Sequence, residues 1–253
     1  MLKTRIIPVL LLRNGRMVKG RQFRDFRDTG DPVSAARIYN AQYADELVFL
    51  DIEASAEGRG TLVDMIQRVS RECFMPLTVG GGIADTDTIR ELLRAGADKV
   101  VITTAAVENP GLIAEAAGLF GKQCIVVGID VRREDGRHVV YTHSARTRTG
   151  VDLLQHVAEM ERLGAGELFL NSIDHDGMMD GYDLELARTV RQRTSLPVII
   201  CGGAGHFAHL VAAIQDAGVQ AVACASVFHF GDNNPIRARS FLKNAGIDVK
   251  NVK

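Results

Sequence analysis

Short apolar runs alternate with amphipathic segments along the whole chain. Several runs are apolar throughout and rich in β-branched residues, which is typical of parallel strands buried on both faces. The predicted strands are residues 5–12, 46–52, 76–79, 99–102, 123–130, 167–171, 197–201 and 221–224. The predicted helices are residues 31–43, 59–73, 85–95, 109–119, 150–163, 182–193, 205–217 and 234–245.

Capping residues stand at the ends of some of these helices. Asp85 is a predicted N-cap, and Gly96 and Gly164 are predicted to end the helices before them. Eight strands alternating with eight helices favour a (β/α)8 barrel, with a doubly wound open sheet as the alternative. The length of 253 residues suits a single barrel domain over residues 1–253.

A near-repeat divides the chain into two similar halves, about residues 1–121 and 122–253. Residues 79–82 (Val-Gly-Gly-Gly) recur as residues 200–203 (Ile-Cys-Gly-Gly), about 121 positions later. Residues 45–51 recur at the same offset as residues 166–172. Two four-strand halves can pair at both edges and leave no free edge, so the repeat favours the closed barrel.

Two long segments interrupt the alternation. Residues 13–30 are predicted to form a long basic loop after the first strand, and residues 132–150 follow the fifth strand. Residues 138–141 are predicted to belong to a hairpin inside the second segment. Both segments follow strand ends on the face where barrel enzymes place their active sites, so a functional role is expected.

The overall composition excludes several classes of protein. A net charge of -1 gives no bulk attraction to nucleic acid or to a membrane surface. No apolar segment reaches the roughly 20 residues of a membrane helix, and no secretory leader is visible, so we expect a cytoplasmic protein. The four cysteines form no CxxC pair and are expected to be free thiols, without a metal site or a cofactor.

The glycine pairs are candidate phosphate sites. Glycine lets a backbone approach an anion closely, and the helix that follows presents N–H donors. A lone pair of glycines could serve a tight turn only, whereas two copies at matching places favour a ligand with two phosphates. Thr104 and Ser226 could add a hydroxyl donor to each site.

Two carboxylates follow predicted strands. Asp130 closes an apolar strand and is a candidate acid or base at the barrel mouth, with an ion pair to Arg132 or Arg133 as its alternative role. Asp176, after the sixth strand, is either a second functional carboxylate or the cap of a turn.

The repeat pairs Asp130 with Leu11. Leucine cannot transfer a proton, so acid–base chemistry that uses both halves symmetrically is in doubt. At the opposite ends of the strands, charged residues come from the first, second, fourth and sixth strands. These residues are Arg5, Glu46, Lys99 and Glu167, and they are expected to be either ordinary strand caps or a ring of ion pairs that closes the barrel bottom.

Motifs along nearly the whole chain resemble the cyclase (synthase) subunit of imidazole glycerol phosphate synthase. Residues 226–230 and 103–107 fit this family better than the related isomerase that precedes it in histidine synthesis. The matching segments, in order, are residues 5–8, 18–20, 30–32, 45–51, 78–82, 96–99, 109–110, 172–177 and 226–230.

The resemblance implies a barrel paired with a separate glutaminase subunit as a heterodimer. Ammonia would enter the barrel bottom, cross the core, and react with a bisphosphate ribulosyl-aminoimidazole nucleotide. The products would be imidazole glycerol phosphate and an aminoimidazole carboxamide ribotide.

The family's functional positions match residues of this chain one by one. The salt-bridge gate matches Arg5, Glu46, Lys99 and Glu167, the channel lining matches Thr78, and Asp98 matches a position that faces the glutaminase. Lys19 matches the mobile loop over the substrate, and Asp130 matches one of two catalytic aspartates. The phosphate positions match Gly82, Thr104, Gly177, Gly203 and Ser226.

The chain departs from the family at three of these places. Leu11 stands where the second catalytic aspartate is expected, Thr103 where the family usually has asparagine, and Asn171 where it usually has threonine. Loss of one acid–base group commonly costs about 10²–10⁴ in rate. The pattern suggests a divergent paralogue that keeps ammonia delivery.

Two hypotheses follow. In the first, the chain makes imidazole glycerol phosphate with Asp130 as the remaining acid–base group. In the second, it activates a glutaminase and channels ammonia to another acceptor, such as a surface-polysaccharide (lipopolysaccharide) sugar amidinated by a third protein. A stand-alone sugar-phosphate isomerase would leave the charged bottom and Asp98 without a purpose.

Overall fold

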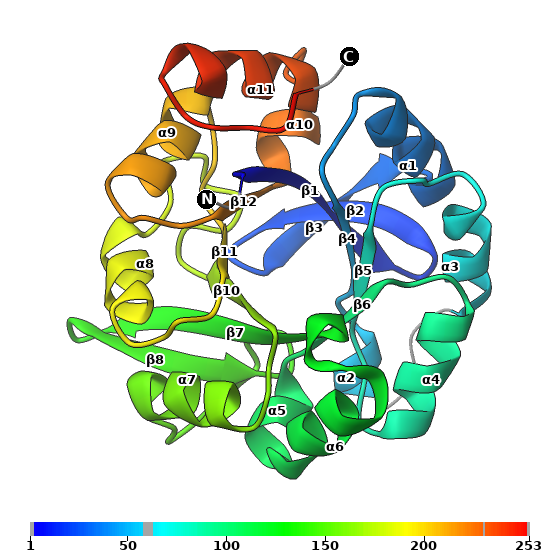
Figure 1. The fold of residues 1–253 in the computed structure, drawn as a ribbon, viewed down its shortest axis with the longest axis vertical. Coiled ribbons are helices and arrows are strands. Elements are labelled where there is room, and N and C mark those ends of the chain that lie inside the picture. Colours follow the sequence, from blue (N-terminus) through cyan, green and yellow to red (C-terminus); the bar gives the residue numbers. More distant parts are fainter. Residues whose placement is uncertain (1–2, 58–62, 230, 252–253) are drawn as a thin grey trace.

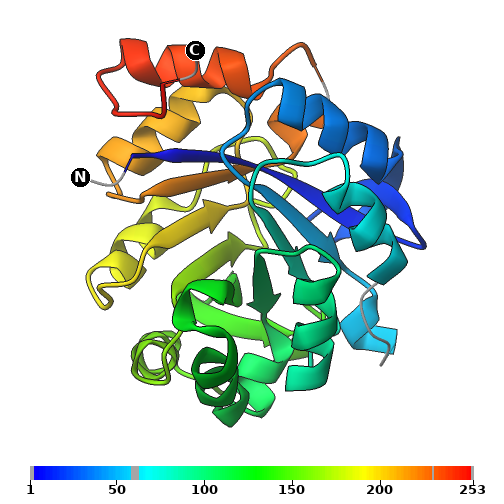
Figure 2. The same cartoon turned by 45° about the vertical axis from the view of Figure 1, so that its right-hand side comes forward.

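Eight parallel strands close into a barrel in the computed structural model, which describes residues 3–57, 63–229 and 231–251. The last barrel strand pairs with the first, and helices surround the barrel (Figures 1 and 2). The closed (β/α)8 barrel is therefore confirmed. In order around the barrel, the strands are β1 (Arg5–Arg13), β4 (Leu47–Asp51), β5 (Leu77–Gly80), β6 (Lys99–Ile102), β7 (Ile125–Glu134), β10 (Glu167–Ser172), β11 (Val198–Cys201) and β12 (Ala221–Cys224).

Each predicted helix has a counterpart, although residues 59–62 of the second lie outside the described residues. The outer helices are α1 (Pro32–Ala41), α3 (Val63–Ser70), α4 (Thr86–Arg94), α6 (Gly111–Phe120), α7 (Leu153–Arg162), α8 (Leu184–Arg191), α9 (Phe207–Gln215) and α11 (Pro235–Asn244). Shorter helices are α2 (Ala54–Glu57), α5 (Thr104–Glu108), α10 (Ser226–His229) and the 3-10 turn η1 (Lys122–Cys124). Asp85 caps α4 as predicted, since its side chain accepts a hydrogen bond from the Thr88 N–H at 2.7 Å.

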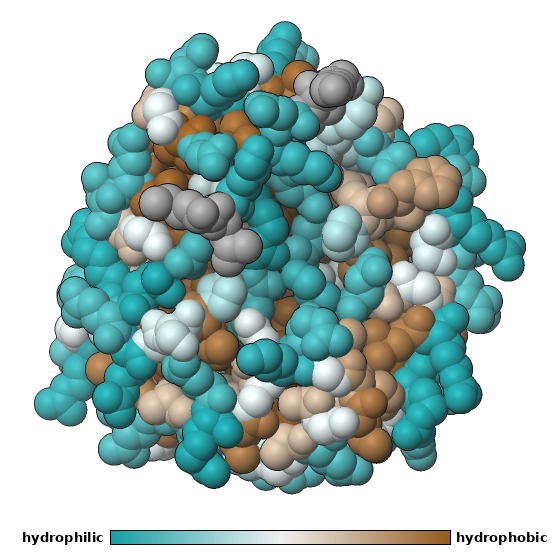
Figure 3. All heavy atoms as spheres, in the orientation of Figure 1, coloured by the Kyte–Doolittle hydropathy of each residue, from teal (hydrophilic) through white to brown (hydrophobic). Residues whose placement is uncertain are grey.

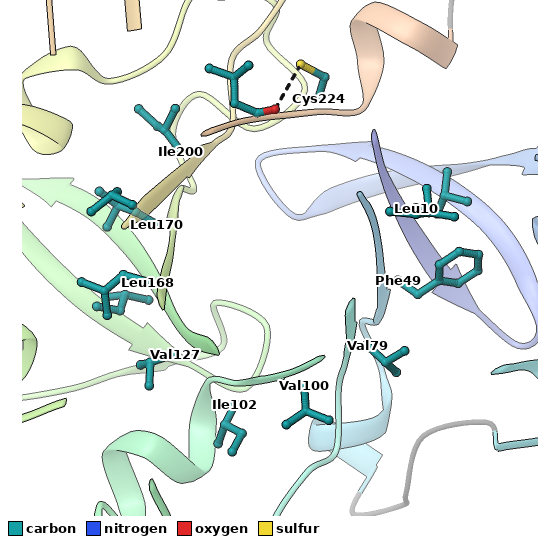
Figure 4. Packing of buried hydrophobic residues seen from close by; sticks show 14 of the residues in the cluster. Leu10, Phe49, Val79, Val100, Ile102, Val127, Leu168, Leu170, Ile200 and Cys224 are labelled. Atoms are coloured by element: carbon teal, nitrogen blue, oxygen red, sulfur yellow. Dashed lines mark hydrogen bonds between the residues drawn. The ribbon is translucent and has the colours of Figure 1, made fainter. Parts of the chain in front are cut away.

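Alternate residues of each strand serve two separate cores. Side chains such as Leu10, Phe49 and Ile200 point outward and pack under the helices (Figure 4). A second, smaller cluster fills the inside of the barrel, where Val9 and Phe169 are both buried. Both faces of the barrel strands are therefore covered, which explains why their runs are apolar throughout. The four cysteines are free thiols, of which three are buried.

The prediction of a loop over residues 13–30 was wrong. This segment forms an antiparallel hairpin of β2 (Arg16–Arg21) and β3 (Arg24–Gly30). Met17 and Val18 are buried on β2. These two apolar residues lie between arginines in the sequence, so they do not stand out as a strand pattern. The hairpin predicted around residues 138–141 is confirmed, because β8 (Arg137–Thr142) pairs antiparallel with β7 and with β9 (Thr147–Arg148).

Three consecutive residues after β8 adopt left-handed backbone conformations. His143, Ser144 and Ala145 have φ values of 52°, 54° and 63°. A side chain at such an angle costs about 1–2 kcal/mol relative to the right-handed region. Ser144 is held there by donating a hydrogen bond to the Ile52 carbonyl at 2.5 Å, whereas no hydrogen bond of the methyl side chain of Ala145 can offset the cost.

We expect Ala145→Gly to stabilise the fold by about 0.5–1 kcal/mol, because glycine adopts this φ without a steric penalty. Chemical denaturation should show a higher midpoint at an unchanged slope. The matched control is Ala114→Gly in α6, an exposed helical position where the same exchange should cost about 1 kcal/mol. A lower midpoint for Ala145→Gly would contradict the strain.

Candidate active site

A cavity opens at the carboxyl ends of the barrel strands, beneath the β2–β3 hairpin. Its inner walls come from strand residues that point into the barrel, and its cover comes from Phe23 and Phe26 of the hairpin. The apolar lining includes Val9, Leu11, Leu50, Ile52, Ile83, Val101 and Phe169. The polar lining includes Lys19, Thr103, Thr104, Asp130, Ser144, Asn171 and Asp176.

Asp130 lies at the floor of this mouth, as predicted from its position at the end of a strand. Its Oδ1 accepts a hydrogen bond from Asn171 Nδ2 at 3.3 Å. Burial raises the pKa of Asp130 to about 7, against the hydrogen bond from Asn171, which lowers it, and with the nearby Asp176 carboxylate, which raises it. A carboxyl group that titrates near neutrality can both take and return a proton.

Neither predicted arginine pairs with Asp130 among the described residues. The Arg132 guanidinium lies 4.6 Å from the centre of the Tyr141 ring, and Arg133 Nη1 lies 2.7 Å from Glu185 Oε2. The alternative role of Asp130 as an arginine partner is therefore wrong in this structure.

Leu11 and Asp130 line the same mouth, which agrees with their pairing by the repeat. Leu11 also packs against the inner apolar cluster. The place opposite Asp130 thus offers a hydrocarbon surface and no proton-transfer group.

Lys19 and Asp176 form a buried ion pair across the mouth. Lys19 is 3% exposed, and its Nζ lies 2.5 Å from Asp176 Oδ1. The hairpin is also held by Gln22, whose backbone N–H donates to the Asp176 carbonyl at 2.7 Å and whose side chain donates to the Asp174 carbonyl at 2.9 Å. Asp176 is therefore engaged by the hairpin and does not replace the missing carboxylate in this state.

The first glycine turn borders the cavity. Gly81 and Gly82 have φ values of 107° and 67°, and a Cβ on Gly81 would lie 2.2 Å from the Asp51 carbonyl oxygen. Thr104 begins α5 at the same rim, and its hydroxyl accepts a hydrogen bond from the His143 N–H at 3.1 Å. Gly82 and Thr104 are thus brought together at one side of the mouth.

The second predicted phosphate position is covered. Gly177, Gly203 and Ser226 are not among the described residues that line the cavity. The hairpin approaches Gly177 so closely that a Cβ there would lie 2.2 Å from the Gly20 carbonyl oxygen. Ser226 is buried, and the N–H of Gly181 donates to the Gly203 carbonyl at 2.8 Å. A ligand reaching both turns requires the hairpin to move.

The four charged residues at the barrel bottom form one network of ion pairs. Arg5 Nη1 lies 2.7 Å from Glu46 Oε2, and Arg5 also pairs with Glu167. Lys99 Nζ lies 3.0 Å from Glu46 Oε2 and 3.1 Å from Glu167 Oε2. The ring geometry is confirmed, and these residues are more than separate strand caps.

Thr78 completes the ring from β5, because its hydroxyl donates to Glu46 Oε1 at 2.5 Å. Asp98 lies outside the ring and is exposed, and its Oδ2 accepts a hydrogen bond from the Leu77 N–H at 2.8 Å.

Two aromatic side chains on loops that precede barrel strands are also exposed: Phe74 at 86% and Tyr43 at 52%. Figure 3 shows apolar side chains gathered on the right of the view, over the region of α1, α3 and α4.

Several mouth residues were not predicted from the sequence. Cys201 lines the cavity directly before the second glycine pair. It lies two positions after Ile199 on the same inner face of the strand, and this spacing could have indicated its place. Phe23 and Phe26 were isolated aromatic residues within a basic stretch, which was a signal for a buried contact. Ser144 left no signal, because its place depends on the left-handed turn.

The described residues contain no group of three metal-ligating side chains. Within the described ranges no helix has the length and apolar character needed to cross a bilayer.

Comparison with known families agrees with the barrel fold. Residues 5–234 match the family described as histidine biosynthesis protein, whose members are biosynthetic enzymes with this barrel. The match spans all eight strands and both glycine turns. The chain belongs to the histidine biosynthesis protein family.

Proposed function

We propose that this protein is the synthase-type subunit of a glutamine amidotransferase, and that it uses glutaminase-derived ammonia at the barrel mouth. The observation that carries the proposal is the ring of ion pairs at the end opposite Asp130, in which two buried carboxylates, Glu46 and Glu167, hold the partly exposed Arg5 and Lys99. A stand-alone isomerase has no need for a charged closure at that end, whereas a subunit that admits ammonia there does.

The route between the two ends suits neutral ammonia. Apolar side chains, among them Ala221, Ala223 and Val126, fill the inside of the barrel between the ring and the mouth. A charged ammonium ion pays a large desolvation cost in such surroundings, and neutral ammonia does not. Ammonia released at the bottom would thus travel inward only in its reactive form.

A glutaminase subunit is the proposed partner, as a heterodimer. The exposed Phe74 and Tyr43 supply apolar area, and Asp98 supplies a charge on loops before the barrel strands. Aromatic residues of this kind are enriched at the centres of protein interfaces. Docking there would place the released ammonia next to the ring.

At the mouth, the proposed substrate is the bisphosphate ribulosyl-aminoimidazole nucleotide, and the products are imidazole glycerol phosphate and an aminoimidazole carboxamide ribotide. One phosphate would bind at Gly82 and Thr104, and the other at Gly177, Gly203 and Ser226 once the hairpin has moved. Asp130 would move the protons of the cyclisation, because its pKa of about 7 suits both directions of transfer.

Leu11 favours a second candidate function. The side chain opposite Asp130 is apolar, and Asp176 is engaged by Lys19. Asp51, the third carboxylate that lines the mouth, accepts hydrogen bonds from the Glu53 and Ala54 N–H groups, so acid–base chemistry falls to Asp130. Such a barrel would cyclise poorly but could still activate a glutaminase and pass ammonia to a third protein. A sugar of a surface polysaccharide is one acceptor that amidination would modify.

Turnover with excess ammonium salt separates these functions, since ammonia from solution bypasses the glutaminase. Native protein, Leu11→Asp and the uncharged control Leu11→Asn are assayed with the bisphosphate nucleotide. We expect Leu11→Asp to exceed native protein by about tenfold or more, because it restores a second acid–base group. Leu11→Asn should show no gain.

Ordinary enzyme rates for the native protein would support the cyclase and assign the second proton transfer to another group. An inactive native protein together with an active Leu11→Asp variant would support ammonia delivery to another acceptor. If neither protein turns over and neither stimulates a glutaminase, the proposed function is wrong.

A further inference from the structure

Asn171 is the neighbour of Asp130 in the barrel wall. The parallel ladder between β7 and β10 sets the two residues directly beside each other. Both side chains line the mouth, and Asn171 Nδ2 donates to Asp130 Oδ1 at 3.3 Å. Asn171 is 6% exposed, so surrounding atoms fix its position.

The orientation of the Asn171 amide is fixed by its surroundings. Its Oδ1 faces the second glycine turn, 3.1 Å from the place a Cβ on Gly202 would take, and it accepts no hydrogen bond among the described residues. Rotating the amide by half a turn would set its oxygen against the Asp130 carboxylate and remove the one hydrogen bond that Nδ2 makes among the described residues. The amide therefore presents its N–H to Asp130.

We propose that Asn171 is a positioning residue that holds Asp130 Oδ1, so that Asp130 Oδ2 is the oxygen that carries the proton in the reaction. The role of Asp130 Oδ2 in the reaction rests on the proposed function. The hydrogen bond from Asn171 and its effect on the ionisation of Asp130 are independent of that function.

The assignment explains how one carboxylate serves a mouth in which Leu11 replaces a second. Oδ2 takes a proton from the substrate, and the electron pair of the broken bond stays on the substrate. In a later step Oδ2 returns the proton, and Asp130 regains its charge. Because Asn171 donates to Oδ1 throughout, Oδ2 is the oxygen that takes part in both proton transfers.

Four other titratable groups line the mouth with Asp130. Asp51 of β4 accepts hydrogen bonds from the Glu53 and Ala54 N–H groups at 3.2 and 3.1 Å. Asp176, from the loop after β10, pairs with Lys19 of the hairpin, and both line the mouth. Cys201 of β11 also lines it, and burial raises the pKa of that thiol well above its ordinary range. On the β1 side, Leu11 does not titrate.

An isosteric pair of variants tests the proposal. Asn171→Thr keeps a hydroxyl that can donate to Asp130, and Asn171→Val has the same shape without a donor. The ionisation of Asp130 is followed by ¹³C NMR or infrared difference spectra of the ligand-free protein, with Asp130→Asn as the reference that identifies its signal. Circular dichroism checks that each variant is folded.

We expect Asn171→Val to raise the midpoint of the Asp130 titration by about one pH unit, because a hydrogen bond to the charged form is lost. In Asn171→Thr the midpoint should stay within a few tenths of a pH unit of the native value. An equal shift in both variants, or none in Asn171→Val, would overturn the positioning role. This result does not depend on turnover, so it stands apart from failure of the proposed function. Where turnover is measurable, its pH profile should shift in the same direction for Asn171→Val alone.

Discussion

Asp130→Asn should slow turnover severely and at the same time make the fold more stable at pH 8. The loss of the acid–base group is expected to lower the turnover rate by about 10²–10⁴. The gain in stability follows from the cost of holding a charged carboxylate in the mouth, where burial raises the pKa of Asp130 to about 7. Asparagine has a similar shape and carries no charge.

The pH dependence of this gain has a definite sign. The pKa of Asp130 rises from 3.8 in its ordinary state to about 7 in the fold, so the folded protein binds this proton more tightly than the unfolded chain. The native fold therefore loses stability as pH rises from about 4 to about 7, and the loss is complete above that. We expect Asp130→Asn to be more stable by about 2–4 kcal/mol at pH 8 and nearly unchanged at pH 4.

Denaturant unfolding of both proteins at pH 4, 6 and 8 measures the difference. The matched control is Asp176→Asn, which removes the partner of the buried Lys19 and should lower stability instead. Equal stability of Asp130→Asn and native protein at pH 8 would show that the carboxylate is not disfavoured in the mouth.

The fold could be predicted from the sequence because each barrel strand is covered on both sides. Strand β6 was predicted at its observed bounds, and the strand predicted at residues 76–79 lies at Leu77–Gly80. The hairpin over residues 16–30 could not be predicted in the same way. β2 is buried at four consecutive positions that include Lys19 and Gly20, and β3 is largely exposed and rich in charged residues, so neither strand shows the apolar pattern that marks a strand.

The site could be predicted only where a residue's role depends on its place along a strand. Asp130 closes a strand and Arg5 begins one, so their ends of the barrel followed from the pattern. The pair of Lys19 and Asp176 joins residues 157 positions apart and depends on how the hairpin folds back. The contact between Asn171 and Asp130 depends on the register of two strands, which no periodicity reveals.

Glu46→Gln should destabilise the fold by about 2–3 kcal/mol, because removing one partner of a buried ion-pair network leaves the remaining charges uncompensated. Glu46 is 1% exposed and accepts hydrogen bonds from Arg5, Lys99 and Thr78. In the variant, two cations would share Glu167 alone. Their partial exposure keeps the cost below that of a fully buried pair.

Denaturant unfolding at neutral pH measures this loss, with Glu72→Gln as the matched control. Glu72 pairs with Arg37 on the surface, so its exchange should cost less than about 0.5 kcal/mol. If the ring also gates ammonia, Glu46→Gln should reduce glutamine-dependent turnover more than turnover with ammonium salt. Equal losses with both nitrogen sources would confine the ring to stability, because ammonia from solution can reach the mouth without passing it.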